Sequence, residues 1–144
     1  MSAPADRKGT ATLADLLAKP EEDAFELIAG ELVPKEAARG PHGRAQTKLG
    51  ALLDPFHRRG GGPPERPGGW WFASDVIVQF GPHDVRRPDV SGWRRERMTD
   101  MPTEPPIVVV PDWLCEIVSP SNASKDTIAN MRLFHRARVP HYWL

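Results

Sequence analysis

The chain has 144 residues, of which 40% are hydrophobic, and its 19 basic residues balance 19 acidic ones. This size supports one hydrophobic core, so we expect a single domain over residues 1–144, with a flexible polar segment at 1–9. Zero net charge excludes a protein that is basic throughout, one cysteine excludes an intrachain disulfide, and the lack of a long apolar span excludes a membrane segment. We therefore expect a soluble, cytoplasmic protein.

A short helix and a β-hairpin are predicted near the start of the chain. A helical pattern runs through Leu17 and is followed by Pro20, which ends it. Two apolar runs at 25–28 and 31–33 are separated by the two residues of a tight turn. Ala29 fits this turn imperfectly, because the first position of the turn requires a positive φ.

A long helix and a loop come next. Residues 42–58 place most of their apolar side chains on one side, as an amphipathic helix does. Pro55 lies within this pattern, so we expect the helix to end or kink near Asp54. Residues 60–69 are mostly glycine and proline and predict a loop.

The second half of the chain contains several apolar strands and ends on a helix and a strand. Because Leu144 still lies inside an apolar run, we expect the last strand to be truncated. In chain order, the pattern predicts strands at 70–80, 86–92, 107–110 and 113–118, a helix that Ser124 caps from 125 to about 138, and a strand at 141–144.

Two acidic residues stand inside these apolar strands. Asp89 follows a proline in the strand at 86–92, and Glu116 lies in the strand at 113–118. A carboxylate in such a position needs a charged partner or a metal ion. The two residues therefore either share one divalent cation or serve the structure separately. In the structural alternative, Asp89 caps a turn and Glu116 pairs with Arg132 or Arg136.

The order of helices and strands, together with several short motifs, resembles a known group of proteins. The sequence is similar to the PD-(D/E)XK nuclease superfamily and, more closely, to the bacterial Uma-two family of putative restriction endonucleases. The resemblance implies an α/β fold with a restriction endonuclease-like core, in which helices flank a central mixed β-sheet and a helix and hairpin precede it. The stretches that carry it are 25–33, 87–90 with Pro88-Asp89, 111–121 with Glu116 before Ser119-Pro120-Ser121, and 131–144.

The resemblance also implies a function. It implies a metal-dependent DNA endonuclease that hydrolyses phosphodiester bonds, in which Asp89 and Glu116 bind Mg²⁺ or Mn²⁺. Mg²⁺ suits such a pair, because it prefers a few carboxylate oxygens and keeps several waters. Strand alternation places Val118 on the same face as Glu116, so its side chain or its carbonyl borders the metal site. Cleavage of both DNA strands would favour a homodimer.

The chain departs from this group at the lysine that assists the attacking water. The superfamily position, two residues after the glutamate, holds Val118, and the Uma-two position, four residues before Phe134, holds Asn130. Asparagine can hydrogen-bond a water or a phosphate, but it carries no charge. Lys125, about one and a half helical turns earlier, is the candidate substitute. The alternative function is thus a catalytically inactive member of the same fold, acting as a nucleic-acid-binding or protein-interaction module.

Other polar residues are weaker candidates for the same site. His42 begins the long helix, where it either faces the site or is solvated, and a helix N-terminus favours a phosphate. Glu26 in the hairpin is either a third acid of the site or an exposed strand residue. Arginines beside Trp93 either contact the DNA backbone or belong to an ordinary solvated surface. These arginines are Arg94, Arg95 and Arg97.

Overall fold

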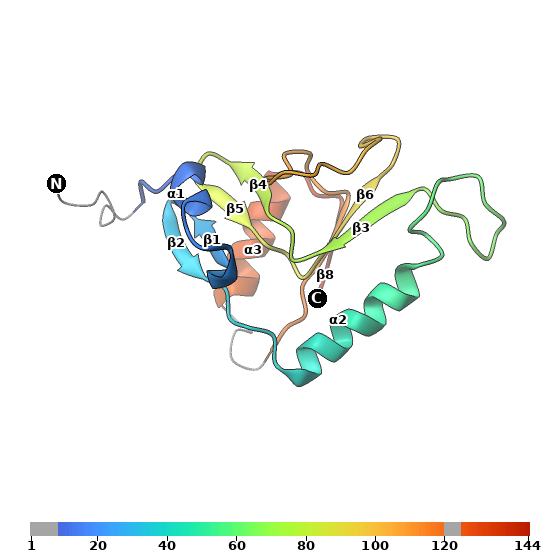
Figure 1. Ribbon diagram of the computed structural model, residues 1–144, viewed down its shortest axis with the longest axis horizontal. Helices are drawn as coiled ribbons and strands as arrows, with labels where there is room; N and C mark the ends of the chain where they lie inside the picture. Colours follow the sequence, from blue (N-terminus) through green and yellow to red (C-terminus); the bar gives the residue numbers. More distant parts are fainter. Residues whose placement is uncertain (1–8, 120–124) are drawn as a thin grey trace.

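The computed structural model describes residues 9–119 and 125–144 (Figure 1). Residues 1–8, which belong to the segment predicted to be flexible, and Ser124, the predicted helix cap, lie outside the described residues. The described part forms, in chain order, α1 (Leu13–Leu17), the 3-10 turn η2 (Glu21–Asp23), β1 (Phe25–Ile28), β2 (Glu31–Pro34), α2 (Gly40–Leu53), β3 (Trp70–Ser74), β4 (Val78–Gly81), β5 (Asp84–Arg86), β6 (Val90–Arg94), β7 (Trp113–Cys115), α3 (Lys125–Arg136) and β8 (His141–Trp143).

The strands form two four-stranded sheets. One has the order β2-β1-β5-β4 and the other the order β3-β6-β7-β8. Strand pairs are antiparallel except β7 and β8, which run parallel. The predicted α/β class is confirmed, whereas the strands are divided between two sheets instead of forming one central sheet.

This division corrects two predicted strands. The strand predicted at 70–80 is broken at Asp75, which has a φ of 56°, into β3 and β4. The strand predicted at 86–92 is broken between β5 and β6, where Pro88 lacks the N–H that a ladder requires. The two breaks lie side by side, because the Asp75 N–H donates to the Pro88 carbonyl at 3.2 Å. Asp89 therefore stands in the junction between the sheets and not inside a strand.

Two further strand predictions were also too long. The strand predicted at 113–118 ends as β7 at Cys115, because its antiparallel partner β6 begins only at Val90. Glu116 directly follows β7, and its N–H donates to the Trp143 carbonyl at 3.0 Å. The segment predicted as a strand at 107–110 makes only an isolated bridge, between Ile107 and Val78.

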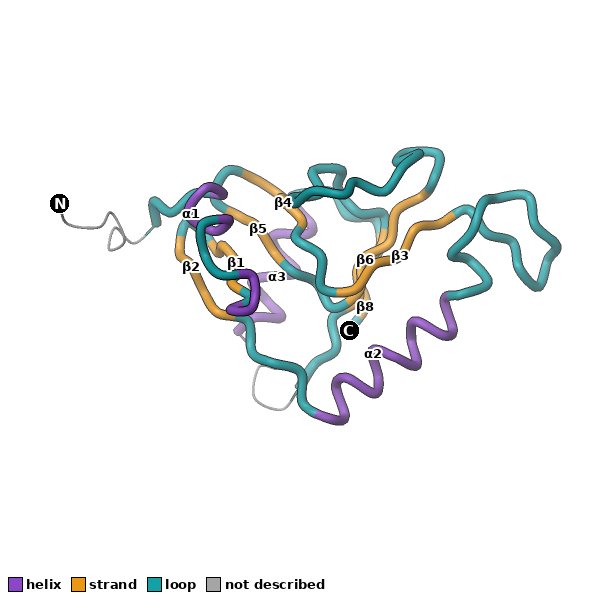
Figure 2. Tube along the Cα trace, in the orientation of Figure 1, coloured by secondary structure: helices purple, strands orange, loops and turns teal. Residues whose placement is uncertain are grey.

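Other local predictions hold. The β1–β2 hairpin turns at Ala29 and Gly30, whose φ angles of 48° and 79° are both positive. Helix α2 begins two residues before the predicted start, with Pro41 in its first turn, and ends before Pro55 as predicted. Figure 2 shows the loop after α2 reaching out at one end of the molecule before the chain returns as β3.

Apolar clusters hold the helices on the sheets. Helix α3 packs Leu133 and Phe134 against Leu114 of β7. Helix α2 contributes Leu49 and Leu53 to a cluster on the β3–β6–β7 side, while Leu52 is 73% exposed. Because α2 is attached along one stripe only, its other faces remain open to solvent. Within the described residues, no helix has the length and apolar character needed to cross a membrane.

Candidate active site

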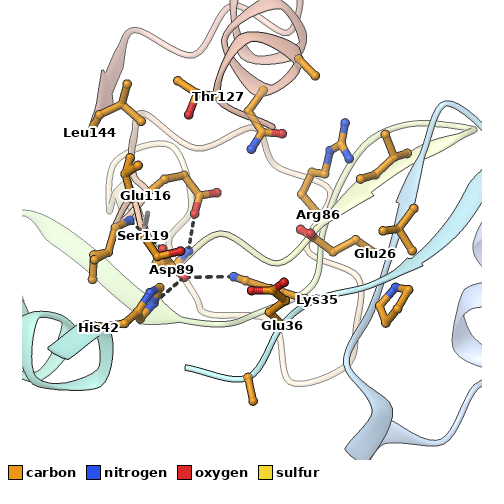
Figure 3. Close-up of a pocket in the computed structure, with 18 of the residues that line it drawn as sticks. Glu26, Lys35, Glu36, His42, Arg86, Asp89, Glu116, Ser119, Thr127 and Leu144 are labelled. Atoms are coloured by element: carbon orange, nitrogen blue, oxygen red, sulfur yellow. Dashed lines mark hydrogen bonds and ion pairs between the residues drawn. The ribbon is translucent and has the colours of Figure 1, made fainter. Parts of the chain in front are cut away.

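A polar cavity of about 340 Å³ lies at the junction of the two sheets (Figure 3). Its walls come from the hairpin, the segment that leads into α2, the break between β5 and β6, the residues after β7, and α3. The charged or hydrogen-bonding side chains that line it are Glu26, Lys35, Glu36, Arg39, His42, Arg86, Asp89, Glu116, Ser119, Thr127, Asn130 and Tyr142.

Asp89 is the centre of the hydrogen bonds in this cavity. It is only 2% exposed. Its Oδ1 atom lies 3.1 Å from Lys35 Nζ and 3.1 Å from His42 Nε2, and Figure 3 shows these two side chains reaching it from different sides. Its Oδ2 atom accepts the Ile117 N–H at 2.7 Å. Burial opposes the charge on Asp89, but Lys35 and these hydrogen bonds outweigh it and lower the pKa of the carboxyl.

Glu116 is the second carboxyl of the site. Its Oε2 atom accepts the Asp89 N–H at 3.3 Å, so the two acidic residues predicted from the sequence meet in space. Burial, reinforced by the nearby Asp89 charge and only partly offset by Lys35, raises the pKa of Glu116 to about 8. Near neutral pH, Asp89 therefore carries the negative charge while Glu116 largely retains its proton.

The ion pair that the structural alternative predicted for Glu116 is not found in the part of the chain that the structure describes. The ion pairs between described residues do not include one from Glu116 to Arg132 or Arg136. Asp89 does occupy a break between strands, but its side chain points into the cavity, where Lys35 and His42 contact it.

Two weaker candidates also belong to the cavity. The His42 side chain is 16% exposed, so it is not the solvated first-turn residue of the alternative. Glu26 lines the cavity, and its Oε2 atom accepts the Arg87 N–H at 2.7 Å. Glu26 thereby holds the segment that carries Asp89 and is not simply an exposed strand residue.

Of the two candidate residues on the predicted helix, the structure describes the side chain of Asn130 but not that of Lys125. Asn130 lines the cavity from α3. Lys125 begins the same helix, but its side chain lies outside the described residues, so its role stays a prediction. Val118 also lines the cavity, yet its side chain has no donor atom for a metal, which leaves only its backbone carbonyl.

Lys35 is a member of the site that the sequence did not reveal. Its Nζ atom donates to Asp89 and to the Arg87 carbonyl, and it lies 3.5 Å from Asp75 Oδ1. Burial lowers the pKa of this ammonium, but the carboxylates of Glu116, Asp89 and Glu26 together raise it overall. In the sequence Lys35 stands next to Glu36, a pattern typical of a solvated loop. The only available signal was its place directly after a predicted strand.

Gln46 of α2 was missed as well. Its Nε2 atom donates to the Asp89 carbonyl at 2.8 Å and to Asp75 Oδ2 at 3.0 Å. It thereby ties the helix to both breaks in the strands. The position of Gln46 one turn after His42 on the same helix was the available signal.

The donor set of the cavity fits a hydrated Mg²⁺ or Mn²⁺ ion. No group of three or more histidine, cysteine or acidic side chains suited to a metal occurs among the described residues. Mg²⁺ requires only one or two carboxylates, because it keeps several of its waters. Asp89 and Glu116 can supply these, and the raised pKa of Glu116 marks a buried carboxyl that a cation would stabilise in its charged form.

The arginines beside Trp93 lie outside the residues that line this cavity, and they are held by the fold. The Arg95 guanidinium lies 3.6 Å from the centre of the Trp71 ring, and Arg97 pairs with Asp112 at 2.7 Å. Trp93 itself is fully buried and belongs to the core. We call Arg94, Arg95 and Arg97 the arginine cluster.

The two sheets and the flanking helices form a restriction endonuclease-like fold, as the sequence predicted. A solved structure with this fold is a putative nuclease belonging to DUF820 from Anabaena variabilis, with a TM-score of 0.66, 23% sequence identity, and coverage of 86% of this chain and 68% of that chain. The Uma2 family model, described as putative restriction endonuclease, matches residues 11–144. The chain therefore belongs to the Uma2 family, which confirms the Uma-two resemblance. No curated protein matched the chain.

Proposed function

We propose that this protein is a metal-dependent endonuclease that hydrolyses phosphodiester bonds in DNA. The observation that carries the proposal is the meeting of Asp89 and Glu116 in one cavity, with 3.3 Å between the Asp89 nitrogen and Glu116 Oε2. The family of the chain and its fold support a nuclease. The metal ion and the DNA substrate are the parts that we propose.

Several residues of the chain hold the proposed metal ligand Asp89 and its neighbouring backbone in place. Mg²⁺ or Mn²⁺ held by Asp89 and Glu116 would polarise a phosphoryl oxygen and lower the pKa of a bound water. His42 and the Ile117 N–H fix the two oxygens of Asp89, so this carboxylate needs little rearrangement. Glu26 holds the adjacent Arg87 backbone in place.

Helix α2 supports DNA as the substrate. Its sequence contains Arg44 and Lys48 but no acidic residue, and both basic side chains are exposed. Arg39, directly before the helix, is exposed and also lines the cavity. These three basic residues lie on or next to the helix that brings His42 into the cavity, and basic side chains attract phosphate groups whatever the base sequence.

The test is nicking of supercoiled plasmid by purified protein in Mg²⁺, in Mn²⁺ and in EDTA. Asp89→Ala and Glu116→Ala, purified in the same way, reveal any contaminating nuclease. We expect cleavage that depends on metal and falls by about 100-fold or more in each variant, because a carboxylate ligand is lost. Equal cleavage by wild type and both variants would overturn the proposal.

A catalytically inactive DNA-binding module is the second candidate. The observation that favours it is Asn130, which places an uncharged side chain in the cavity where the family resemblance implies a lysine. This candidate predicts no plasmid cleavage by wild type, together with DNA binding that weakens in Arg44→Gln and Lys48→Gln. A homodimer stays a prediction, which sedimentation of the purified protein would test.

A further inference from the structure

The ammonium group of Lys35 occupies a distinctive position in the cavity. It reaches Asp89 from the residue directly after β2, and its side chain is 22% exposed. The Arg87 carbonyl and Asp89 Oδ1 accept two of its hydrogen bonds. Lys35 is thus anchored beside the carboxylate pair and still borders open space in the cavity.

The third contact of Lys35 is the one that a substrate can replace. An ammonium has three donors. The remaining contact goes to Asp75 Oδ1 at 3.5 Å, and the Asp75 side chain is 54% exposed. An exposed ion pair of this kind contributes little stability. Lys35 lines the cavity whereas Asp75 does not, so a phosphoryl oxygen in the cavity competes with Asp75 for this third hydrogen bond from another direction, while Asp89 and the Arg87 carbonyl hold the ammonium in position.

The other cations that line the described part of the cavity differ from Lys35. Arg39 is exposed at the edge. Arg86 is 4% exposed and forms an ion pair with Asp84 at 3.7 Å. Asn130 carries no charge. Among the lysines and arginines of the described cavity, Lys35 is the one that forms an ion pair with Asp89.

We propose that Lys35 is a catalytic residue whose ammonium donates a hydrogen bond to a non-bridging phosphoryl oxygen, and that it takes over the role of a lysine at position 130. The proposal rests on the nuclease function proposed above. In the reaction, the water oxygen bonds to phosphorus, the bond from phosphorus to the leaving ester oxygen breaks, the water loses a proton and the leaving oxygen gains one. Lys35 exchanges no proton; it stabilises the negative charge that develops on the phosphoryl group.

The test compares four single variants and one double variant in single-turnover cleavage of DNA at saturating protein. Lys35→Met removes the charge, Lys35→Gln keeps a polar side chain without charge, and Lys35→Arg keeps the charge. Lys19→Met is the matched control, because Lys19 is an exposed lysine that lies over the Phe25 ring and does not line the cavity. Melting temperatures are recorded for all, so that a folding defect in the Met variant is recognised and the Gln variant then carries the test.

We expect Met and Gln at position 35 to slow cleavage by about 100-fold or more, Arg to retain more of the rate than either, and Lys19→Met to match wild type. Adding Asn130→Lys to Lys35→Met should raise the cleavage rate about tenfold or more above that of Lys35→Met, because it returns a cation to the same cavity. If Lys35→Met or Lys35→Gln cleaves within about threefold of the wild-type rate, the role of Lys35 is overturned, while the proposed nuclease function stands. Absence of cleavage by wild type would overturn the nuclease function and this proposal together.

Discussion

The cavity and the arginine cluster both gather charged side chains, but they hold them in different ways. In the cavity, two carboxyls with oppositely shifted pKa values lie beside the half-buried ammonium of Lys35. In the arginine cluster, Arg95 stacks on Trp71 and Arg97 pairs with Asp112. Each of these two arginines already has a partner from the fold.

This difference assigns the proposed chemistry to the cavity and a role in stability to the arginine cluster. Arg95 and Arg97 make their contacts within the fold and do not line the cavity, whereas Lys35 and Asp89 form their ion pair inside it. In the cavity, Glu116 forms no ion pair with another described residue and its pKa is raised to about 8, and such perturbed groups cluster at functional sites. Changes in the cavity should therefore alter cleavage and pH dependence, whereas changes around the arginine cluster should alter stability.

The largest expected effect on stability concerns the protonation of Glu116. An ordinary glutamate carboxyl has a pKa of 4.5, whereas burial raises the pKa of Glu116 to about 8 in the folded protein without metal. A raised carboxyl pKa gives stability that is present below the unfolded value and is lost as pH rises through the folded value. Relative to Glu116→Gln, wild type in EDTA should thus lose stability on the order of a few kcal/mol between about pH 5 and pH 9.

Urea unfolding of both proteins across this pH range provides the measurement. Glu31→Gln is a suitable control, because Glu31 is an exposed residue of β2 at the hairpin turn. If the free energies of unfolding of wild type and Glu116→Gln differ by the same amount at all pH values, the predicted pH dependence is contradicted and Glu116 ionises normally.

The next effect concerns Asp112, which supports the arginine cluster. It is 5% exposed, its Oδ2 atom accepts the Arg94 N–H at 2.8 Å, and Oδ1 pairs with Arg97. Asp112→Ala should destabilise the protein by about 2–3 kcal/mol, since a backbone N–H loses its acceptor. Chemical denaturation is the measurement, with the exposed Asp100→Ala as control. Equal stabilities of the two variants would contradict this account of the cluster.

A smaller loss is expected for Arg95. Its guanidinium lies over Trp71, and its Nε atom donates to the Trp70 carbonyl at 2.9 Å. Arg95→Ala should therefore cost about 1 kcal/mol of stability, measured by the same denaturation. A tenfold loss of cleavage rate at unchanged stability would instead assign Arg95 to the substrate site.

The smallest effect is expected for Arg97. Its side chain is 43% exposed, so its ion pair with Asp112 is open to solvent. Arg97→Gln should lower stability by no more than about 1 kcal/mol, and the loss should shrink further in high salt. Denaturation at low and high salt checks this, and a larger loss at high salt would contradict it.

The sequence predicted the elements of the fold better than their pairing. The hairpin and the end of α2 before Pro55 follow from local rules of turn geometry and proline chemistry. The breaks at Asp75 and Pro88 could not be predicted in the same way. They arise because paired strands leave one sheet and enter another, which depends on contacts far apart in the chain.

The same reasoning applies to the cavity. Asp89 and Glu116 were visible because a carboxylate in an apolar run is unusual, and the structure brings them together. Lys35 and Gln46 were not visible, because a lysine after a strand and a glutamine in a helix are ordinary. Their proximity to Asp89 is fixed by the path of the segment between β2 and α2, which local patterns do not determine.

We assign the chemistry to the cavity and not to the arginine cluster. The most direct test compares the single-turnover rates of metal-dependent DNA cleavage by two charge-neutralising variants, one from each region. Asp89→Asn keeps the shape of this side chain and removes its charge, whereas Arg97→Gln removes one charge from the arginine cluster. We predict a loss of about 1,000-fold or more for Asp89→Asn and of about threefold or less for Arg97→Gln. Similar rates for the two variants would contradict the assignment of the chemistry to the cavity.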